Sequence, residues 1–305
     1  ARKLKPDPFF TPDVPRLVSL GGFDQDLPTI ADCDWIVEAV VERLDLKQAL
    51  LHKVEAHRPA GSIVSSNTSG IPIAAIAEGR SDEFRRHWLG THFFNPPRYL
   101  RLLEVIPTAD TDPAIVARIG TFADHYLGKG IVIAKDTPNF IANNIGLFGV
   151  MRILDVLASG RYTIEEIDAM TGPAVGRPKS ATFRTMDLTG LDVLAHVASN
   201  LAERLDDEAD RRAFALPPLI QDMVKRGWIG EKAGQGFYRK QKGSGGSEIL
   251  TLDPDTMDYR PSQSPRLGPL AAGRGDGGLL GAPHPARRRR SLQGPRRQRR
   301  SRGLP

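Results

Sequence analysis

The chain has 305 residues, a formal net charge of +6 and a single cysteine, Cys33. Eleven arginines and only one acidic residue lie in residues 261–305, so residues 1–260 carry a net charge of −4. The folded part is therefore not expected to bind nucleic acid, and one cysteine excludes an internal disulfide and a cysteine-based metal cluster. No apolar run approaches the roughly twenty residues that cross a bilayer, and the first residues lack a signal-peptide core. These features predict a cytoplasmic protein without a membrane span.

Residues 1–34 are rich in proline and lack the glycine-rich turn that a dinucleotide-binding fold needs after its first strand. Such a fold holds the pyrophosphate of its cofactor on the backbone N–H groups of a G-x-G-x-x-G turn and on the helix that follows. No such pattern precedes Asp34. We therefore expect that the chain begins after this unit, with a divergent phosphate loop as the alternative.

From Trp35 onward, short apolar runs alternate with helical patterns. Strands are predicted at residues 35–40, 62–66, 87–94 and 130–134, and helices at residues 43–56, 71–77 and 111–127. The last of these helices begins with Asp112-Pro113, which favours a helix N-terminus. This alternation predicts an α/β fold with an incomplete, Rossmann-type, largely parallel sheet that has helices on both faces.

After Pro138 the pattern changes to helices alone, at residues 140–159, 163–170, 191–205 and 214–226. Thr163 and Glu166 have the spacing of a capping box. The first of these helices is apolar on most sides. We expect it to pack against a second copy of the chain in a homodimer, and burial within one subunit is the alternative.

Polar residues that could do chemistry concentrate between Ser65 and Glu104, where predicted strands end. Ligands bind at the carboxyl ends of the strands in open α/β sheets. The Pro96-Pro97 bend cannot continue a strand, so a hairpin-like return would bring His92 next to Glu104. A carboxylate that bonds one imidazole nitrogen leaves the other free to accept a proton. The pattern predicts a base and its orienter; a packed core histidine and a loop of capping hydroxyls are the plainer alternatives.

Six stretches, in order across residues 30–240, resemble the 3-hydroxyacyl-CoA dehydrogenase family. They are Val37–Glu42, Ser66–Ser69, Gly90–Pro96, Leu103–Ile106, Lys135–Asn143 and Lys232–Tyr238. The stretches at 95–100 and 171–180 are most similar to the dehydrogenase part of bifunctional fatty-acid oxidation proteins.

The resemblance implies an oxidoreductase that uses NAD to convert a 3-hydroxyacyl-CoA substrate into 3-oxoacyl-CoA in fatty-acid β-oxidation. His92 matches the base that removes the proton of the 3-hydroxyl group, and Glu104 matches its orienter. Ser69 and Asn143 match side chains that hydrogen-bond the reacting oxygen and stabilise its developing charge.

The resemblance also implies which residues lie near the cofactor. These are Ala39, Glu42, Lys47 and Asn67. The chain departs from the family at Asn139, where glycine is usual, and at Asn144, where arginine is common. Both departures flank Asn143.

We therefore expect a truncated NAD-binding domain (1–135), an all-helical substrate and dimerisation domain (136–242), and a flexible linker with a disordered Arg/Gly/Pro-rich tail (243–305). Two alternatives stay open. One is a non-catalytic or cofactor-deficient fragment that dimerises. The other is a hydrolase that uses Ser69, His92 and Glu104 as a triad, although the G-x-S-x-G elbow of such enzymes is missing.

Overall fold

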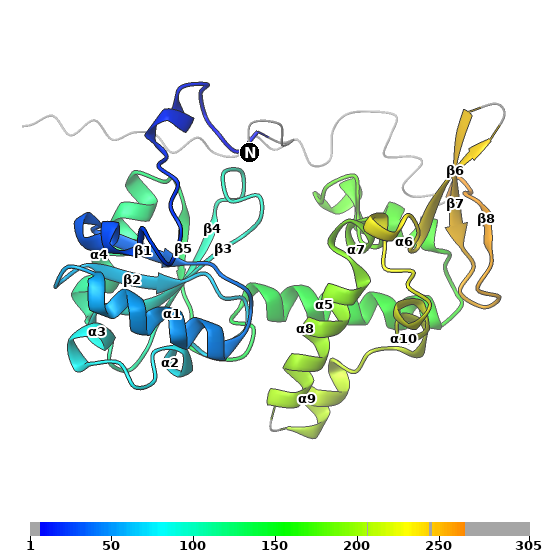
Figure 1. Cartoon of the computed structure of the whole chain (residues 1–305). Helices are drawn as coiled ribbons and strands as arrows, with labels where there is room; N and C mark the ends of the chain where they lie inside the picture. The colour runs from blue at the N-terminus through cyan, green and yellow to red at the C-terminus, as the bar shows by residue number, and fades with distance from the viewer. Residues whose placement is uncertain (1–6, 206, 244–245, 266–305) are drawn as a thin grey trace, which may run out of the picture.

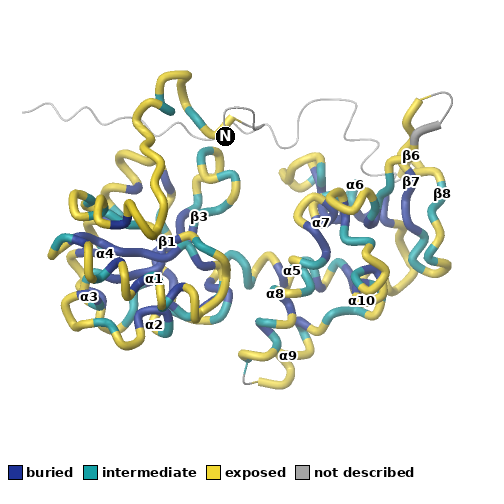
Figure 2. Tube along the Cα trace, in the orientation of Figure 1, coloured by how far each residue is buried: buried dark blue, intermediate teal, exposed yellow. Residues whose placement is uncertain are grey.

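The chain folds into an α/β domain and a mainly helical domain, joined by the long helix α5 (Ala142–Ala158) (Figure 1). The computed structural model describes residues 7–205, 207–243 and 246–265. Residues 266–305, where we expect a disordered tail, lie outside the described residues. Figure 2 shows a largely buried sheet in the first domain, whereas the buried residues of the second domain lie along its helices and on a C-terminal strand.

The first domain is built on a five-stranded sheet with the order β1-β2-β3-β4-β5. Its strands are Trp35–Glu38, Ile63–Ser66, Trp88–Phe93, Leu102–Pro107 and Gly130–Ile133. Three of the four pairings are parallel, and β3 pairs with β4 antiparallel. The predicted Rossmann-type sheet is confirmed. The antiparallel pair arises because a short proline-containing loop, rather than a helical crossover, connects its two strands.

Four helices flank this sheet, and two short 3₁₀ helices precede it. They are α1 (Leu44–His57), α2 (Ile73–Ile76), α3 (Asp82–Arg86) and α4 (Pro113–His125), with η1 (Val14–Leu17) and η2 (Leu27–Asp32) before them. Helix α1 buries Lys47, Leu51 and Val54, which share one face. The carboxylate of Asp112 accepts the N–H of Ala114 at 2.8 Å, which confirms the predicted start of α4. Helix α3 is too short to show a periodic pattern, so the sequence did not reveal it.

The second domain contains six helices in the described residues. They are α5 (Ala142–Ala158), α6 (Ile164–Thr171), α7 (Phe183–Thr189), α8 (Leu191–Arg204), α9 (Glu208–Ala213) and α10 (Pro218–Lys225). The 3₁₀ turns η3 (Pro173–Val175) and η4 (Glu231–Ala233) connect some of them. The capping box of Thr163 and Glu166 is confirmed, because each side chain bonds the other residue's backbone N–H.

Helix α5 is less buried than its sequence suggests. Leu147, Met151, Leu154 and Leu157 face the core, whereas Ile145 and Phe148 are 68% and 47% exposed. The alternative, in which one subunit buries most sides of this helix, is therefore wrong. Across the described ranges, neither α5 nor any other helix is long and apolar enough to span a bilayer.

A small antiparallel sheet follows the helices and corrects the predicted domain organisation. It consists of β6 (Tyr238–Gly243), β7 (Gly246–Leu252) and β8 (Tyr259–Pro261). The domain is thus not all-helical, and part of the expected linker is strand: Gly243 ends β6, Gly246 begins β7, and the two residues pair. The sheet forms because Leu250 and Leu252 are buried and Leu252 joins the helical core.

Buried carboxylates fasten this sheet to the helices. Asp187 on α7 accepts the backbone N–H groups of Phe237 and Tyr238, each at 2.8 Å, and Asp168 accepts the Tyr238 hydroxyl at 2.8 Å. Burial raises the pKa of Asp187 to about 6, although both N–H donors act in the opposite direction. Glu165 on α6 pairs with Arg260 on β8 at 2.7 Å. These contacts close the second domain around its C-terminal strands.

Candidate active site

His92 and Glu104 lie opposite each other on the antiparallel strands β3 and β4. Residues in such register point to the same face of the sheet. The Nδ1 atom of His92 is therefore 2.8 Å from Oε2 of Glu104, and the structure brings together the two side chains that the sequence places on either side of the proline bend.

The second carboxylate oxygen of Glu104 accepts backbone N–H groups where the helical domain begins. Oε1 accepts from Ile141 at 3.0 Å and from Ala142 at 2.7 Å. Burial raises the pKa of Glu104, but the hydrogen bonds from His92, Ala142 and Ile141 outweigh it, so the pKa lies below its ordinary value. An ionised carboxylate only accepts hydrogen bonds. His92 consequently donates from Nδ1, and its Nε2 atom is left free to accept a proton.

Aromatic rings surround the imidazole of His92, which is 4% exposed. The Phe94 and Phe140 ring centroids are 4.5 and 5.6 Å from the imidazole centroid. Within the described part of the chain, Nε2 makes no hydrogen bond. The pair thus has the geometry expected of a base and its orienter, in an apolar setting where electrostatic interactions are strong.

Ser69 and Asn143 come from different domains and contact each other. The Asn143 side-chain amide donates to the backbone carbonyl of Ser69 at 3.3 Å. Asn144 instead donates to the carbonyls of Pro138 and Phe140, which supports the turn into α5. Among the described residues no hydrogen bond joins Ser69 to His92, so the contact between nucleophile and base that a hydrolase triad needs is absent.

Three of the predicted cofactor residues, Ala39, Glu42 and Asn67, follow the carboxyl ends of β1 and β2, whereas Lys47 lies on α1. Glu42 organises the loop that follows β2. Its Oε1 atom accepts from the Thr68 hydroxyl at 2.5 Å, from Ser69 N at 2.9 Å and from Gly70 N at 3.2 Å. Burial raises the pKa of Glu42, but the bonds from Thr68 and Ser69, together with nearby Lys47, lower it below its ordinary value. Glu42 is thus an anion that shapes the Ser69 loop.

The other three cofactor candidates differ in accessibility. Ala39 is exposed, and Asn67 is half-buried with its side-chain oxygen bonded to Phe93 N at 2.9 Å. Lys47 is 1% exposed and bonds Glu38 at 2.8 Å and Glu42 at 3.3 Å. It therefore supports Glu42 from the interior. Glu38 was missed in the sequence, although a carboxylate within an apolar strand signals a buried partner.

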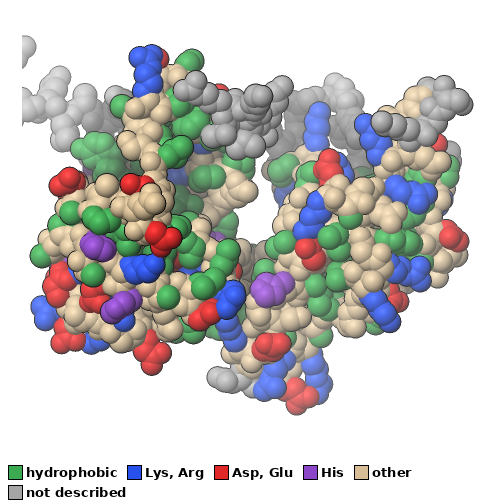
Figure 3. All heavy atoms as spheres, in the orientation of Figure 1, with side chains coloured by type: hydrophobic (Ala, Val, Ile, Leu, Met, Phe, Trp, Pro, Cys, Tyr) green, Lys and Arg blue, Asp and Glu red, His purple; other side chains and the backbone are tan. Residues whose placement is uncertain are grey.

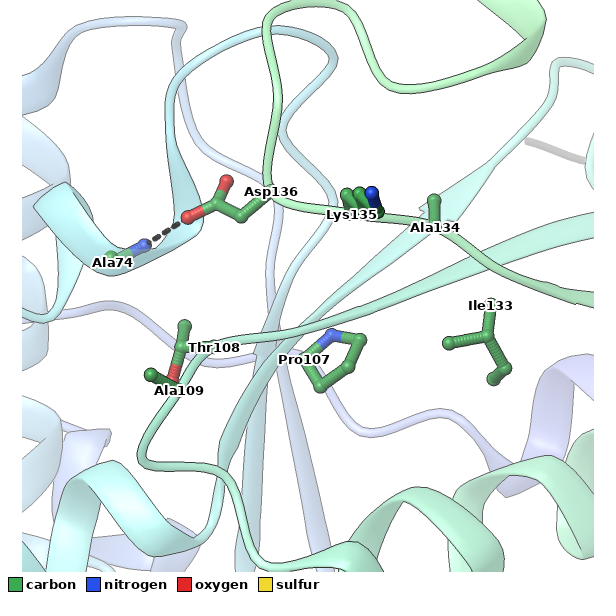
Figure 4. Close-up of a pocket in the computed structure, with 8 residues that line it drawn as sticks. All are labelled: Ala74, Pro107, Thr108, Ala109, Ile133, Ala134, Lys135 and Asp136. Carbon is green, nitrogen blue, oxygen red and sulfur yellow. Dashed lines mark hydrogen bonds between the residues drawn. The ribbon is translucent and has the colours of Figure 1, made fainter.

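A separate hollow of about 440 Å³ lies beyond the ends of β4 and β5 (Figure 4). Its lining residues are Ala74, Pro107, Thr108, Ala109, Ile133, Ala134, Lys135 and Asp136. Asp136 points toward α2 and accepts the N–H groups of Ile73 and Ala74 at 2.7 and 2.8 Å. This carboxylate holds α2 in place, and none of the candidate site residues lines the hollow.

The chain combines a Rossmann-type sheet, a helical domain and a buried His–Glu pair where the two domains meet. This combination is typical of a two-domain dehydrogenase. The chain belongs to the 3-hydroxyacyl-CoA dehydrogenase family. The family model for the NAD-binding domain matches residues 2–137, and the model for the C-terminal domain matches residues 140–240.

Individual relatives agree with this family. The chain is 49% identical to a probable 3-hydroxyacyl-CoA dehydrogenase of Bacillus subtilis over 84% of its own length but only 32% of that protein. It is 47% identical to a probable 3-hydroxyacyl-CoA dehydrogenase of Deinococcus radiodurans over 79% of the chain and 69% of that protein. The crystal structure of Mycobacterium tuberculosis FadB2 is 32% identical, with a TM-score of 0.64 over 70% of this chain and 73% of that one.

The match to an NAD-binding domain points to NAD as the cofactor. Ala39 and the Glu42-ordered loop follow β1 and β2, beside the strand that carries His92. Within the described residues, no glycine-rich turn is placed to receive the pyrophosphate half.

Proposed function

We propose that this protein oxidises 3-hydroxyacyl-CoA to 3-oxoacyl-CoA with NAD, and that His92 is the base of the reaction. The observation that carries the proposal is the 2.8 Å contact between His92 Nδ1 and the ionised Glu104 carboxylate. That contact leaves Nε2 as the proton acceptor and provides a negative charge that stabilises the imidazolium formed when the proton arrives.

In the proposed reaction, the 3-hydroxyl group of the substrate donates its proton to His92 Nε2. A bound NAD would supply the acceptor for the hydride that leaves C3. Ser69 and Asn143 approach from the two domains and hydrogen-bond the substrate oxygen, whose charge grows as the proton leaves. Glu42 keeps the Ser69 loop in place through three hydrogen bonds, and Lys47 keeps Glu42 ionised.

The residues proposed to contact the nicotinamide half of NAD are Ala39, Glu42 and Asn67, with Lys47 acting through Glu42. Their place at the carboxyl ends of neighbouring parallel strands supports this assignment. Binding is testable without turnover. The affinity for NADH, measured by quenching of tryptophan fluorescence, should be lower in Glu42→Gln than in the wild type. Equal affinity of the wild type and Glu42→Gln would count against the assignment.

The activity itself is tested by following NADH absorbance with a 3-hydroxyacyl-CoA and NAD, and in reverse with a 3-oxoacyl-CoA and NADH. We expect signals that depend on the thioester in both directions. Glu104→Gln retains an oxygen acceptor for Ile141 and Ala142 but removes the charge beside His92, so turnover should fall between about 10- and 10⁴-fold. Wild-type turnover in the Glu104→Gln variant would reject the proposed mechanism.

We also propose that the chain forms a homodimer through helix α5. Ile145, Phe148 and Val156 are exposed along this helix at 68, 47 and 40%, and exposed apolar stripes of this kind are typical of protein interfaces. Sedimentation should give twice the monomer mass, and Ile145→Glu should shift it to monomer. A dimer that shows no turnover would instead favour a cofactor-deficient dimerising fragment.

The role in fatty-acid β-oxidation and the cytoplasmic location stay predictions. The first is supported by the resemblance to bifunctional fatty-acid oxidation proteins and the second by the single, unpaired Cys33. Growth of a deletion strain on fatty acids, and fractionation of cells that express the protein, would test them.

A further inference from the structure

The segment between the two domains contains two consecutive residues in the left-handed backbone region. Asn139 has φ of 59° and Phe140 has φ of 52°. This region is unfavourable for residues with side chains and least so for asparagine. Two such residues in a row must therefore be held by contacts that they make with their surroundings.

The side chain of Asn139 spans both domains. It is 4% exposed, and its Nδ2 atom donates to the backbone carbonyl of Val197 on α8 at 3.5 Å. Its Oδ1 atom lies against Gly70 in the first domain, so closely that a methyl group added to Gly70 would be 2.7 Å away. Asn139 thus occupies the seam between α8 and the Ser69–Gly70 loop.

Other side chains hold the same loop from both domains. Arg204, at the end of α8, donates to the carbonyl of Gly70, and Asn143 donates to the carbonyl of Ser69 at 3.3 Å. Glu42 accepts the N–H groups of Ser69 and Gly70 from the other side. The helical domain therefore binds the carbonyls of the loop, while the α/β domain binds its N–H groups. Figure 3 shows that the two domains approach each other in only part of the view.

The residues after Asn139 contact the candidate base directly. The Phe140 ring lies 5.6 Å from the His92 ring, and the N–H groups of Ile141 and Ala142 bind Glu104. The backbone conformation at Asn139 consequently determines where the Phe140 ring lies relative to His92. It also determines the position of the two N–H groups that bind Glu104.

We propose that Asn139 is a positioning residue that locks α8 to the Ser69–Gly70 loop and thereby holds Phe140 over His92, with Arg204 as the second half of the lock. The part that concerns His92 rests on the function proposed above. The lock itself is a property of the fold and is testable without catalysis.

The primary test is hydrogen exchange measured on peptides that cover residues 67–72 and 193–200. Asn139→Gly tolerates the left-handed backbone at no steric cost but deletes both side-chain contacts. Loss of the hydrogen bond to Val197 and of the contact with Gly70 should speed local hydrogen exchange about 3–10-fold in both peptides. Exchange in peptides from β3 should stay unchanged. Ala181→Gly is the matched control, because Ala181 is also left-handed, with φ of 49°, and lies outside the seam.

Arg204 gives an independent arm. Arg204→Ala should speed exchange in residues 67–72, and Arg204→Lys, which retains a donor, should restore part of the protection. If either Asn139→Gly or Arg204→Ala exchanges at the wild-type rate in these peptides, the proposal that these residues hold α8 against the loop is rejected. This conclusion does not depend on the activity.

Turnover then decides the part that concerns His92. In a wild-type protein that oxidises the substrate, Asn139→Gly should lower kcat by a larger factor than it raises KM, because the base is misplaced after the substrate has bound. Faster exchange with unchanged kcat would overturn that part. A wild-type protein without activity would remove the proposed function, and the exchange result would still decide the lock.

Discussion

The ammonium group of Lys47 lies 2.8 Å from the carboxylate of Glu38 in the interior of the α/β domain, where their side chains are 1% and 2% exposed. Glu38 also accepts the hydroxyl of Ser66 at 2.5 Å and the N–H of Val40 at 2.6 Å. This network connects α1 with the ends of β1 and β2. Because the charges of Lys47 and Glu38 are buried, removing one of them leaves the other without a partner in the interior.

Lys47→Met should destabilise the protein by about 3–5 kcal/mol, because it leaves the Glu38 carboxylate buried without its counter-charge. Denaturant unfolding measures this change in the free energy of unfolding. Lys53→Met on the same helix is the control, since Lys53 is 55% exposed beside an exposed Asp24, and its effect should be about 0.5 kcal/mol or less. Equal effects of the two substitutions would mean that the buried pair contributes nothing beyond an ordinary surface charge.

His92→Ala should lower turnover by about 10²–10⁴-fold, because it removes the proton acceptor from the reaction. Steady-state NADH formation measures the change. His125→Ala, at the exposed end of α4, should leave the rate unchanged. Undiminished turnover in His92→Ala would show that another group accepts the proton.

Gly230→Ala should cost about 3 kcal/mol or more in the free energy of unfolding. Gly230 has φ of 102°, and an added methyl group would lie 2.3 Å from the backbone oxygen of Asp187, which belongs to helix α7 and cannot move freely. Gly234→Ala isolates the conformational part, because Gly234 has φ of 78° and open space around it. Its cost should be about 1–2 kcal/mol. Thermal unfolding of both variants measures the two losses in the free energy of unfolding. Similar losses would show that the backbone around Asp187 shifts to make room for the added methyl group.

Asp187 should make the protein less stable as the pH rises toward about 6. Its pKa is raised from 3.8 to about 6 by burial, so the folded state binds the proton more tightly than the unfolded state does. The stabilisation is complete below the unfolded pKa and is lost as the pH rises through the folded value. Urea midpoints across this range should fall relative to those of Asp187→Asn, and parallel pH profiles would contradict this prediction.

Glu165 should act in the opposite sense at lower pH. Burial raises its pKa, but the Arg260 side chain and the Gln263 N–H lower it more, to about 2. Its contribution is therefore present above 4.5 and is lost as the pH falls toward 2. The urea midpoint of the wild type should drop across this interval more steeply than that of Glu165→Gln, and equal slopes would exclude Glu165 as the cause.

The sequence by itself determined the local elements and indicated that His92 and Glu104 form a pair. Apolar runs alternating with amphipathic patterns predicted the parallel strands, because hydrophobic period and turn residues are local properties. The proline bend between His92 and Glu104 indicated that those two residues return toward each other, and Thr163 with Glu166 indicated a helix start. Each of these signals lies within a few residues of the feature it predicts.

Only the tertiary structure decided the contacts between segments that are far apart in the chain. Lys47 matches a position near the cofactor, and only the packing shows that it is buried against Glu38. A glycine-rich run that reads as a linker contributes Gly243 and Gly246 to the paired strands β6 and β7. Just before β6, the N–H of Phe237 is bonded by Asp187, which lies fifty residues earlier in the chain. Asn139 reads as a departure from the family pattern, yet its side chain joins two domains. Burial and desolvation depend on all neighbours at once, and a linear pattern does not record them.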